Sequence, residues 1–221
     1  MGLFIDLEGL DGCGKTTQTE LLCERFNNLG ISFKKIKLPD YESDSSILVR
    51  KYLHGDFGKN ANDVNAFAAS VLYTVDRFAS YTEKWKNDYN NGTLIFADRY
   101  TPANAIYQMT KLPRSEWDFY IEWLFDLEYK KVGIPEPDKV IFLDMPVEVS
   151  QRLMTERYNG DETKKDVHEA DTVFLNNCRD AALYAAKKCD WTVISCSDGE
   201  KPYSIESINN RIFEEIKDII L

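Results

Sequence analysis

The chain has 221 residues, and its 27 basic and 37 acidic side chains give a formal net charge of −10. This surplus of acid argues against nucleic acid as a partner and against binding to an anionic membrane surface. Asp6 and Glu8 interrupt the first apolar segment, and no run approaches the roughly 18 apolar residues of a spanning helix. We therefore expect a cytoplasmic protein without a signal peptide or membrane segment.

Cysteine and histidine usage points away from several kinds of chemistry. The five cysteines are an odd number and include no Cys-x-x-Cys pair, so reduced thiols are expected. Neither of the two histidines, His54 and His168, has metal-ligand spacing or a neighbouring nucleophile motif. Zinc sites and hydrolase triads are therefore not predicted.

Short apolar runs rich in branched and aromatic residues alternate with longer segments of helical spacing. This alternation predicts a single α/β domain over residues 1–221, with a parallel sheet wrapped by helices. The predicted strands are Leu3–Leu7, Phe33–Leu38, Leu94–Ala97, Val140–Leu143 and Trp191–Ile194. The predicted helices are Thr16–Leu29, Val64–Asp88, Arg114–Lys131, Val147–Glu156, Ala170–Lys188 and Ile205–Ile219.

The strongest motif follows the first predicted strand. Residues Gly9–Thr16 fit the pattern G-x-x-x-x-G-K-[ST] and precede a predicted helix, which is the context of a phosphate-binding loop. Its glycines let backbone N–H groups face phosphate oxygens, Lys15 reaches the terminal phosphates and the Thr16 hydroxyl holds magnesium. The expected nucleotide-binding residues are Gly9, Gly12, Cys13, Gly14, Lys15, Thr16 and Thr17.

A second polar site is predicted where the third strand ends. Asp98 and Arg99 follow the apolar run Leu94–Ala97, and ligands of open α/β sheets bind at the carboxyl ends of strands. Asp98 can orient magnesium or its water, and Arg99 offers a bidentate fork for a second phosphate.

The order of these motifs resembles that of the thymidylate kinases, a family of P-loop nucleoside monophosphate kinases. The resemblance rests on Glu8–Thr17, on Asp98-Arg99-Tyr100 with the later Tyr107-Gln108, and on Tyr73–Arg77 in the place of the family's Asp-Arg helix motif. It implies a three-layer P-loop NTPase fold with five parallel strands and a lid near residues 155–171. It also implies ATP as co-substrate, Mg2+, transfer of the γ-phosphoryl to dTMP, and a homodimer packed through the long helices.

The resemblance further assigns roles to single residues. Tyr73 is the stacking platform for thymine, Arg77 donates to a thymine carbonyl and Asn104 hydrogen-bonds the base. Tyr107 lies below the deoxyribose, and Asp11 positions the sugar and the acceptor phosphate. The acceptor site implied in this way comprises Asp11, Tyr41, Tyr73, Arg77, Arg99, Asn104 and Tyr107.

The phosphate loop carries no arginine, so the resemblance implies that the lid supplies the cation for the transition state. Arg157 is the first choice and Arg152 the second, because they precede the turn Tyr158-Asn159-Gly160 that could act as a hinge. Lys164 and Lys165 could equally belong to a solvated loop. The expected catalytic residues are Asp11, Lys15, Arg99, Arg152 and Arg157.

Two departures from the family pattern concern the acceptor. Asp40 stands where the family usually has an arginine after a proline, and Ala103 replaces a serine or threonine. Two other functions therefore stay open at this point. One is a deoxynucleoside kinase that uses a carboxylate to activate a 5′-hydroxyl, and the other is a catalytically weak nucleotide-binding protein of the same fold.

Overall fold

The structure is a computed structural model, and it contains two compact units that share strand β1. The described residues are 1–58, 60, 62–157 and 172–221, with the side chain of residue 157 excepted. The first unit comprises residues 1–6 and 32–138, and the second comprises residues 7–31 and 139–221.

All five predicted strands are present, which confirms the α/β class. They form a parallel sheet in the order β2-β3-β1-β4-β5. In the first unit Lys37 of β2 is paired with Asp98 of β3, and in the second Asp144 of β4 is paired with Ser195 of β5. The strands are β1 (Phe4–Gly9), β2 (Phe33–Lys37), β3 (Leu94–Asp98), β4 (Lys139–Asp144) and β5 (Thr192–Ser195).

Aromatic packing forms the core of the first unit. The ring of Phe4 lies 4.8 Å from that of Tyr100 and 5.4 Å from that of Trp85, in tilted or edge-on arrangements. Such pairs are more favourable than their buried area alone suggests. The helices of this unit are α2 (Ile47–His54), α3 (Ala66–Ser80), α4 (Lys86–Asn90), α5 (Pro102–Tyr107) and α6 (Trp117–Phe125).

The helices of the first unit differ in several places from the sequence expectation. The predicted helix 64–88 contains a π-helical turn at Tyr81–Trp85, and the predicted helix 114–131 ends in a π-helical segment, Asp126–Val132. Helices α2 and α5 were not predicted, because eight and six residues are too few to establish a helical period. Three 3₁₀ turns, also not predicted, lie at Asp44–Ser46, Met109–Lys111 and Arg114–Glu116.

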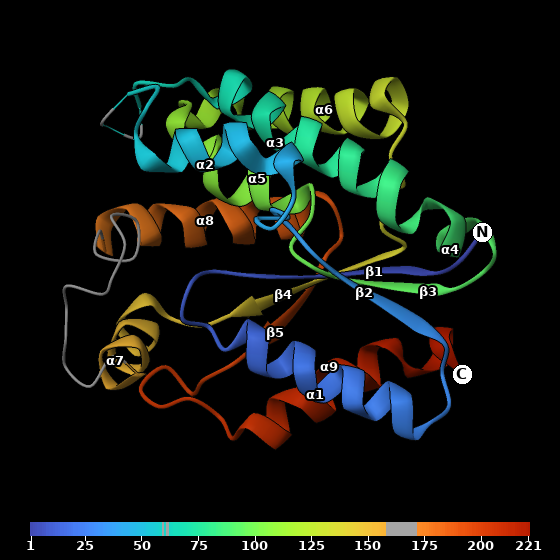
Figure 1. Cartoon of the computed structure of the whole chain (residues 1–221). Helices are drawn as coiled ribbons and strands as arrows, with labels where there is room; N and C mark the ends of the chain where they lie inside the picture. The colour runs from blue at the N-terminus through green and yellow to red at the C-terminus, as the bar shows by residue number, and fades with distance from the viewer. Residues whose placement is uncertain (59, 61, 158–171) are drawn as a thin grey trace. The chain divides into compact units, whose positions relative to one another are not determined.

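The second unit packs helices on both faces of β4 and β5 (Figure 1). Helix α8 covers one face, while α9 and α1 lie side by side on the other, joined by a hydrogen bond of 3.1 Å from Asn209 to the Gln18 side chain. Residues 170 and 171 of the predicted helix 170–188 lie outside the described residues. The helices of this unit are α1 (Lys15–Asn28), α7 (Val147–Arg157), α8 (Thr172–Lys188) and α9 (Ile205–Ile220).

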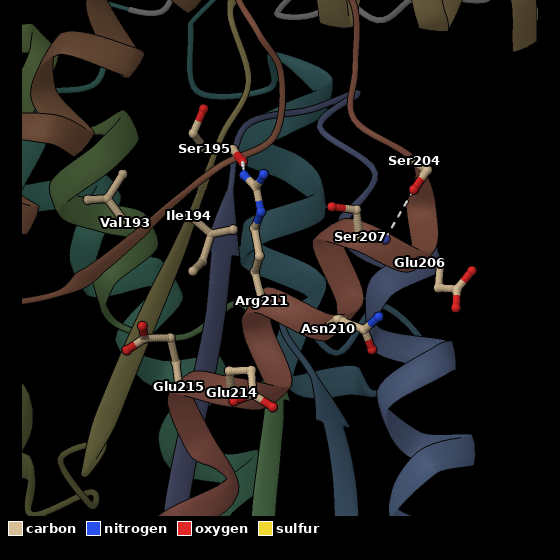
Figure 2. A pocket seen from close by; sticks show the side chains of 10 residues that line it. All are labelled: Val193, Ile194, Ser195, Ser204, Glu206, Ser207, Asn210, Arg211, Glu214 and Glu215. Atoms are coloured by element: carbon tan, nitrogen blue, oxygen red, sulfur yellow. Dashed lines mark hydrogen bonds between the residues drawn. The ribbon is translucent and has the colours of Figure 1, made fainter.

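Strand β5 lies at one edge of the sheet, and a cavity of about 670 Å³ runs between it and α9. Figure 2 shows Arg211 reaching from α9 to the end of this strand, where its Nη1 donates to the Ser195 carbonyl over 3.1 Å. Glu214 and Glu215 line the same cavity. No helix within the described ranges is long and apolar enough to cross a membrane.

Candidate functional site

The phosphate loop connects β1 to α1 in the second unit, as the motif predicts. Gly12 and Gly14 have φ angles of 76° and 86°, which L side chains rarely adopt. Gly14 is the N-cap of α1, and the first turn of this helix has neither a side-chain cap nor an acidic residue. The helix therefore directs backbone N–H groups and its positive end toward the loop, which favours a bound anion.

Two glycines of the loop also approach their neighbours closely. A Cβ atom at Gly9 would lie 2.6 Å from Cys13 Sγ, and one at Gly12 would lie 2.8 Å from Met154 Cγ of α7. Lys15 is buried, with 8% of its surface exposed, whereas Thr16 and Thr17 are exposed. The glycines are thus required by backbone conformation at Gly12 and Gly14, and by packing at Gly9 and Gly12.

Asp98 and Arg99 lie at the carboxyl end of β3 in the first unit, as predicted. Asp98 is buried, and Arg99 has a φ of 73°, a conformation that costs energy for a residue with a Cβ. The Arg99 Nη1 donates to the Tyr107 hydroxyl over 3.0 Å, and its guanidinium carbon lies 5.1 Å from the centre of the Tyr107 ring. The structure therefore brings together the predicted phosphate clamp and the predicted sugar neighbour.

Tyr73 interacts electrostatically with three other predicted acceptor residues of the first unit, Tyr41, Arg77 and Arg99. Burial raises the pKa of its phenol, and the neighbouring phenols of Tyr52 and Tyr41 raise this pKa further, while Arg77 and Arg99 act in the opposite direction. The Tyr52 ring meets the Tyr73 ring edge-on, with 6.2 Å between centres. The proposed base platform thus interacts electrostatically with Arg77, the predicted donor to the base, and with Arg99, the predicted donor to the acceptor phosphate.

Arg77 forms an ion pair that the sequence did not indicate. Its Nε donates to Glu128 Oε2 over 2.8 Å and its Nη2 to Glu128 Oε1, while Nη1 lies 3.5 Å from the Tyr100 carbonyl. Burial opposes the charge of Arg77, but the Glu128 carboxylate outweighs this effect and keeps the guanidinium pKa raised. These bonds use three of the five guanidinium N–H groups.

Asn104 lies on α5 and is 2% exposed. Tyr120 links its backbone to α3, since the Tyr120 hydroxyl lies 2.5 Å from Ser70 Oγ and donates to the Asn104 carbonyl over 3.4 Å. Asn104 Nδ2 is buried and has no hydrogen-bond partner among the residues that the structure describes. A buried donor of this kind normally has a partner, which here points to a ligand.

Asp40 is one of the two residues that depart from the family pattern, and its charge is paired. Its carboxylate forms an ion pair with Lys84, and its backbone N–H donates to Asp76 Oδ2 over 2.9 Å. Asp40 is therefore compensated by an ammonium group that follows α3 in the chain. This pairing reduces the repulsion expected between Asp40 and an acceptor phosphate.

A lysine that the sequence analysis did not select also belongs to this region. Lys111 Nζ donates to the Tyr52 hydroxyl over 2.7 Å and to the Val64 carbonyl over 2.9 Å. Burial lowers its pKa to about 8. Lys111 is therefore connected to the proposed base platform through Tyr52, whose ring meets that of Tyr73.

The predicted lid cations belong to the second unit. Arg152 on α7 is exposed and donates to the Glu200 carbonyl in the loop after β5. Arg157 is the last residue of α7, and its side chain lies outside the described residues. Tyr158-Asn159-Gly160, Lys164 and Lys165 also lie outside them. The choice of Arg157 over Arg152 stays a prediction.

Magnesium would find oxygen ligands among the predicted residues. Thr16 offers an exposed hydroxyl and Asp98 a carboxylate, both donors that suit this cation. Over the described ranges, no cluster of three or more His, Cys, Asp or Glu side chains could hold a metal ion. Phosphoryl-transfer enzymes commonly bind Mg2+ with one or two protein oxygens plus phosphates and water, and each of these residues offers one oxygen of that kind.

Glu128, Lys84 and Lys111 were missed for a common reason. Each acts on a residue distant in sequence, Arg77, Asp40 and Tyr52 respectively. Charged residues in a helical segment are usually solvated, and no local pattern distinguishes these three from their neighbours.

Comparison with known proteins identifies the family. The family model described as thymidylate kinase matches residues 7–208. A thymidylate kinase of Prochlorococcus marinus is 29% identical over 218 residues, covering 97% of this chain and 95% of the relative. A probable thymidylate kinase of Thermococcus onnurineus is 31% identical over 168 residues, covering 74% of this chain and 75% of the relative.

A solved structure shows the same fold. The thymidylate kinase of Candida albicans aligns with a TM-score of 0.69 and 21% identity, covering 99% of this chain and 92% of that one. The family match spans the phosphate loop, the Asp-Arg motif of α3 and the end of β3. The chain belongs to the thymidylate kinase family.

Proposed function

We propose that this protein is an ATP-dependent nucleoside monophosphate kinase that transfers the γ-phosphoryl group of ATP to dTMP, giving dTDP and ADP. The observation that carries the proposal is Asn104 Nδ2, which is buried and has no hydrogen-bond partner within the described ranges. The backbone carbonyl of Asn104 is linked through Tyr120 to the helix that bears Tyr73 and Arg77. An aromatic face, an arginine and an amide suit a flat base with carbonyl groups.

On the donor side, the phosphate loop supplies the recognition of ATP. The uncapped N-terminus of α1 and the left-handed glycines favour bound phosphates, and Lys15 neutralises charge that develops on the transferred group. Thr16 and Asp98 would hold Mg2+ or its water. When bound, this ion neutralises phosphate charge and orients the leaving group.

On the acceptor side, Arg99 would clamp the dTMP phosphate. The hydrogen bond from Arg99 to Tyr107 fixes the guanidinium beside the ring that we assign to the deoxyribose. Tyr41 and Asp11 would complete the phosphate and sugar contacts. Because the dTMP phosphate is already a nucleophile, the site needs placed cations more than a base that takes a proton.

The deciding experiment is an ADP-release assay with Mg2+ and ATP against thymidine, dTMP, dUMP and CMP. We expect clear preference for dTMP, and Lys15→Ala should abolish turnover without loss of the fold, because Lys15 acts on phosphates. Activity on nucleosides alone would instead support a deoxynucleoside kinase. Binding of dTMP without turnover would support a catalytically weak nucleotide-binding protein.

The lid role is tested separately. Arg157→Ala should lower kcat with little change in the KM for dTMP, because a transition-state cation binds the ground state weakly. Arg152→Ala is the matched comparison, since the Arg152 guanidinium already has the Glu200 carbonyl as a partner. A larger loss of kcat in Arg152→Ala would transfer the role to that residue.

We also propose that the protein is a homodimer formed through α3 and α6. Val71, Val75 and Phe78 recur at helical spacing on α3 and are 42%, 45% and 47% exposed, and Phe119 on α6 is 60% exposed. Water-exposed apolar side chains arranged along one helix are typical of an association surface. This surface belongs to the first unit, the one that carries Tyr73 and Arg77.

A further inference from the structure

Glu128 is a fully buried carboxylate that receives four hydrogen bonds. Its Oε1 accepts from Thr74 Oγ1 over 2.7 Å and from Arg77 Nη2, and its Oε2 accepts from Arg77 Nε over 2.8 Å and from Thr101 Oγ1 over 3.0 Å. The donors come from α3 and from the segment that follows β3. A buried ion pair adds little net stability in many proteins, because the cost of desolvating both charges offsets much of their attraction.

The pairing fixes the orientation of the Arg77 guanidinium. Nε–H and one N–H of Nη2 face Glu128, and Nη1 is directed toward the Tyr100 carbonyl. The two N–H groups that remain belong to Nη1 and Nη2, at the distal end of the planar fork. Arg77 is therefore held rigidly, and two of its N–H groups are not used by Glu128 or Tyr100.

Tyr73 precedes Arg77 by four residues on α3, so the two side chains lie on the same face of the helix. Their proximity is also seen in the electrostatics, because the positive charge of Arg77 acts to lower the pKa of the Tyr73 phenol. A pyrimidine that stacks on Tyr73 can thus direct one edge toward the distal end of the Arg77 fork. A carbonyl at that edge accepts a hydrogen bond from Arg77. An amino group there is itself a donor, so it faces the N–H groups of Arg77 and no hydrogen bond forms.

We infer that Glu128 is a positioning residue for base selection: by fixing Arg77, it makes the site accept a carbonyl at position 4 of the pyrimidine and reject an amino group there. This inference rests on the proposed function, since it concerns the base of the acceptor nucleotide. A loosely held arginine would move away from an amino group. An anchored arginine cannot, so its buried N–H groups are left without an acceptor, and this lowers the affinity for the amino-bearing base.

The test compares dTMP with 5-methyl-2′-deoxycytidine monophosphate, which carries an amino group where dTMP has the 4-carbonyl. The quantity measured is kcat/KM for dTMP divided by kcat/KM for 5-methyl-2′-deoxycytidine monophosphate. We expect this ratio to be about tenfold or more lower in Glu128→Gln than in the wild type, while kcat for dTMP changes by less than about threefold. Asn209→Ala is the control for lost stability, because it removes a buried hydrogen bond between α9 and α1 of the second unit and none of the bonds to the Arg77 fork.

The outcomes separate the inference from a structural role and from the proposed function. A lower melting temperature with an unchanged ratio in Glu128→Gln would make Glu128 purely structural and would overturn the inference. If this variant does not fold, Glu128→Asp carries the test, since it keeps the negative charge but is one methylene too short to keep both bonds to the Arg77 fork. An unchanged ratio in Glu128→Asp would equally overturn the inference. Wild-type protein that turns over neither acceptor would instead refute the proposed function.

Discussion

Replacing Gly12 by alanine tests the packing of the phosphate loop against α7. The left-handed backbone at φ 76° costs about 1–2 kcal/mol for a residue with a Cβ. The new methyl group would lie 2.8 Å from Met154 Cγ and 3.1 Å from the Ser150 carbonyl, and overpacking of this kind adds about 1–3 kcal/mol. Gly12→Ala should therefore lower the free energy of unfolding by about 2–5 kcal/mol.

Gly14→Ala is the matched control for this prediction. Gly14 has a similar φ of 86°, but a Cβ there meets no atom within 4 Å, so only the backbone cost of about 1–2 kcal/mol should appear. Urea denaturation without nucleotide measures both variants. In a double-mutant cycle, Met154→Ala should relieve Gly12→Ala by about 1 kcal/mol or more. Equal costs for the two glycine variants, together with no coupling to Met154, would refute the packing argument.

Three further predictions concern the first unit. Asp40→Asn should lower the KM for dTMP about twofold at low ionic strength, because it removes a negative charge and frees the Lys84 ammonium group. An unchanged KM would show that the Asp40–Lys84 pair lies away from the acceptor. The pKa of Lys111 is about 8 in the folded protein, below its unfolded value of 10.5. Between these pH values the unfolded chain binds more protons than the folded one, so the free energy of unfolding should rise from about pH 8 to 9.5. Urea titrations should show this rise in the wild type, and Lys111→Gln should lack it; a rise of equal size in the variant would assign it to another group. Phe78→Asp should convert the proposed dimer to monomer in analytical ultracentrifugation, and a dimer that survives would place the interface elsewhere.

Features set by local sequence were predicted well. The five strands and the phosphate loop follow from apolar runs and from one eight-residue motif, and Asp98 and Arg99 lie at the end of β3 as expected. Strand ends and glycine positions are fixed by neighbours in the chain, so sequence reasoning reaches them.

Features set by tertiary pairing were not predicted. Glu128 gives no sign of its role in sequence, because its partners Thr74 and Arg77 lie more than fifty residues earlier. The sequence likewise could not show that Asp40 is compensated by Lys84. The π-helical segment that contains Glu128 also departs from the regular helix that the 3.6-residue period predicts, and such segments often occur at functional sites.

The Arg211 contact at the end of β5 also affects how copies of the chain can meet. An outer strand exposes backbone groups that a second polypeptide could pair with, which is a common start of aggregation. Here the strand has four residues, its last carbonyl already accepts from Arg211, and Glu214 and Glu215 place two carboxylates beside it. Extension of the sheet by another molecule is therefore disfavoured at this edge.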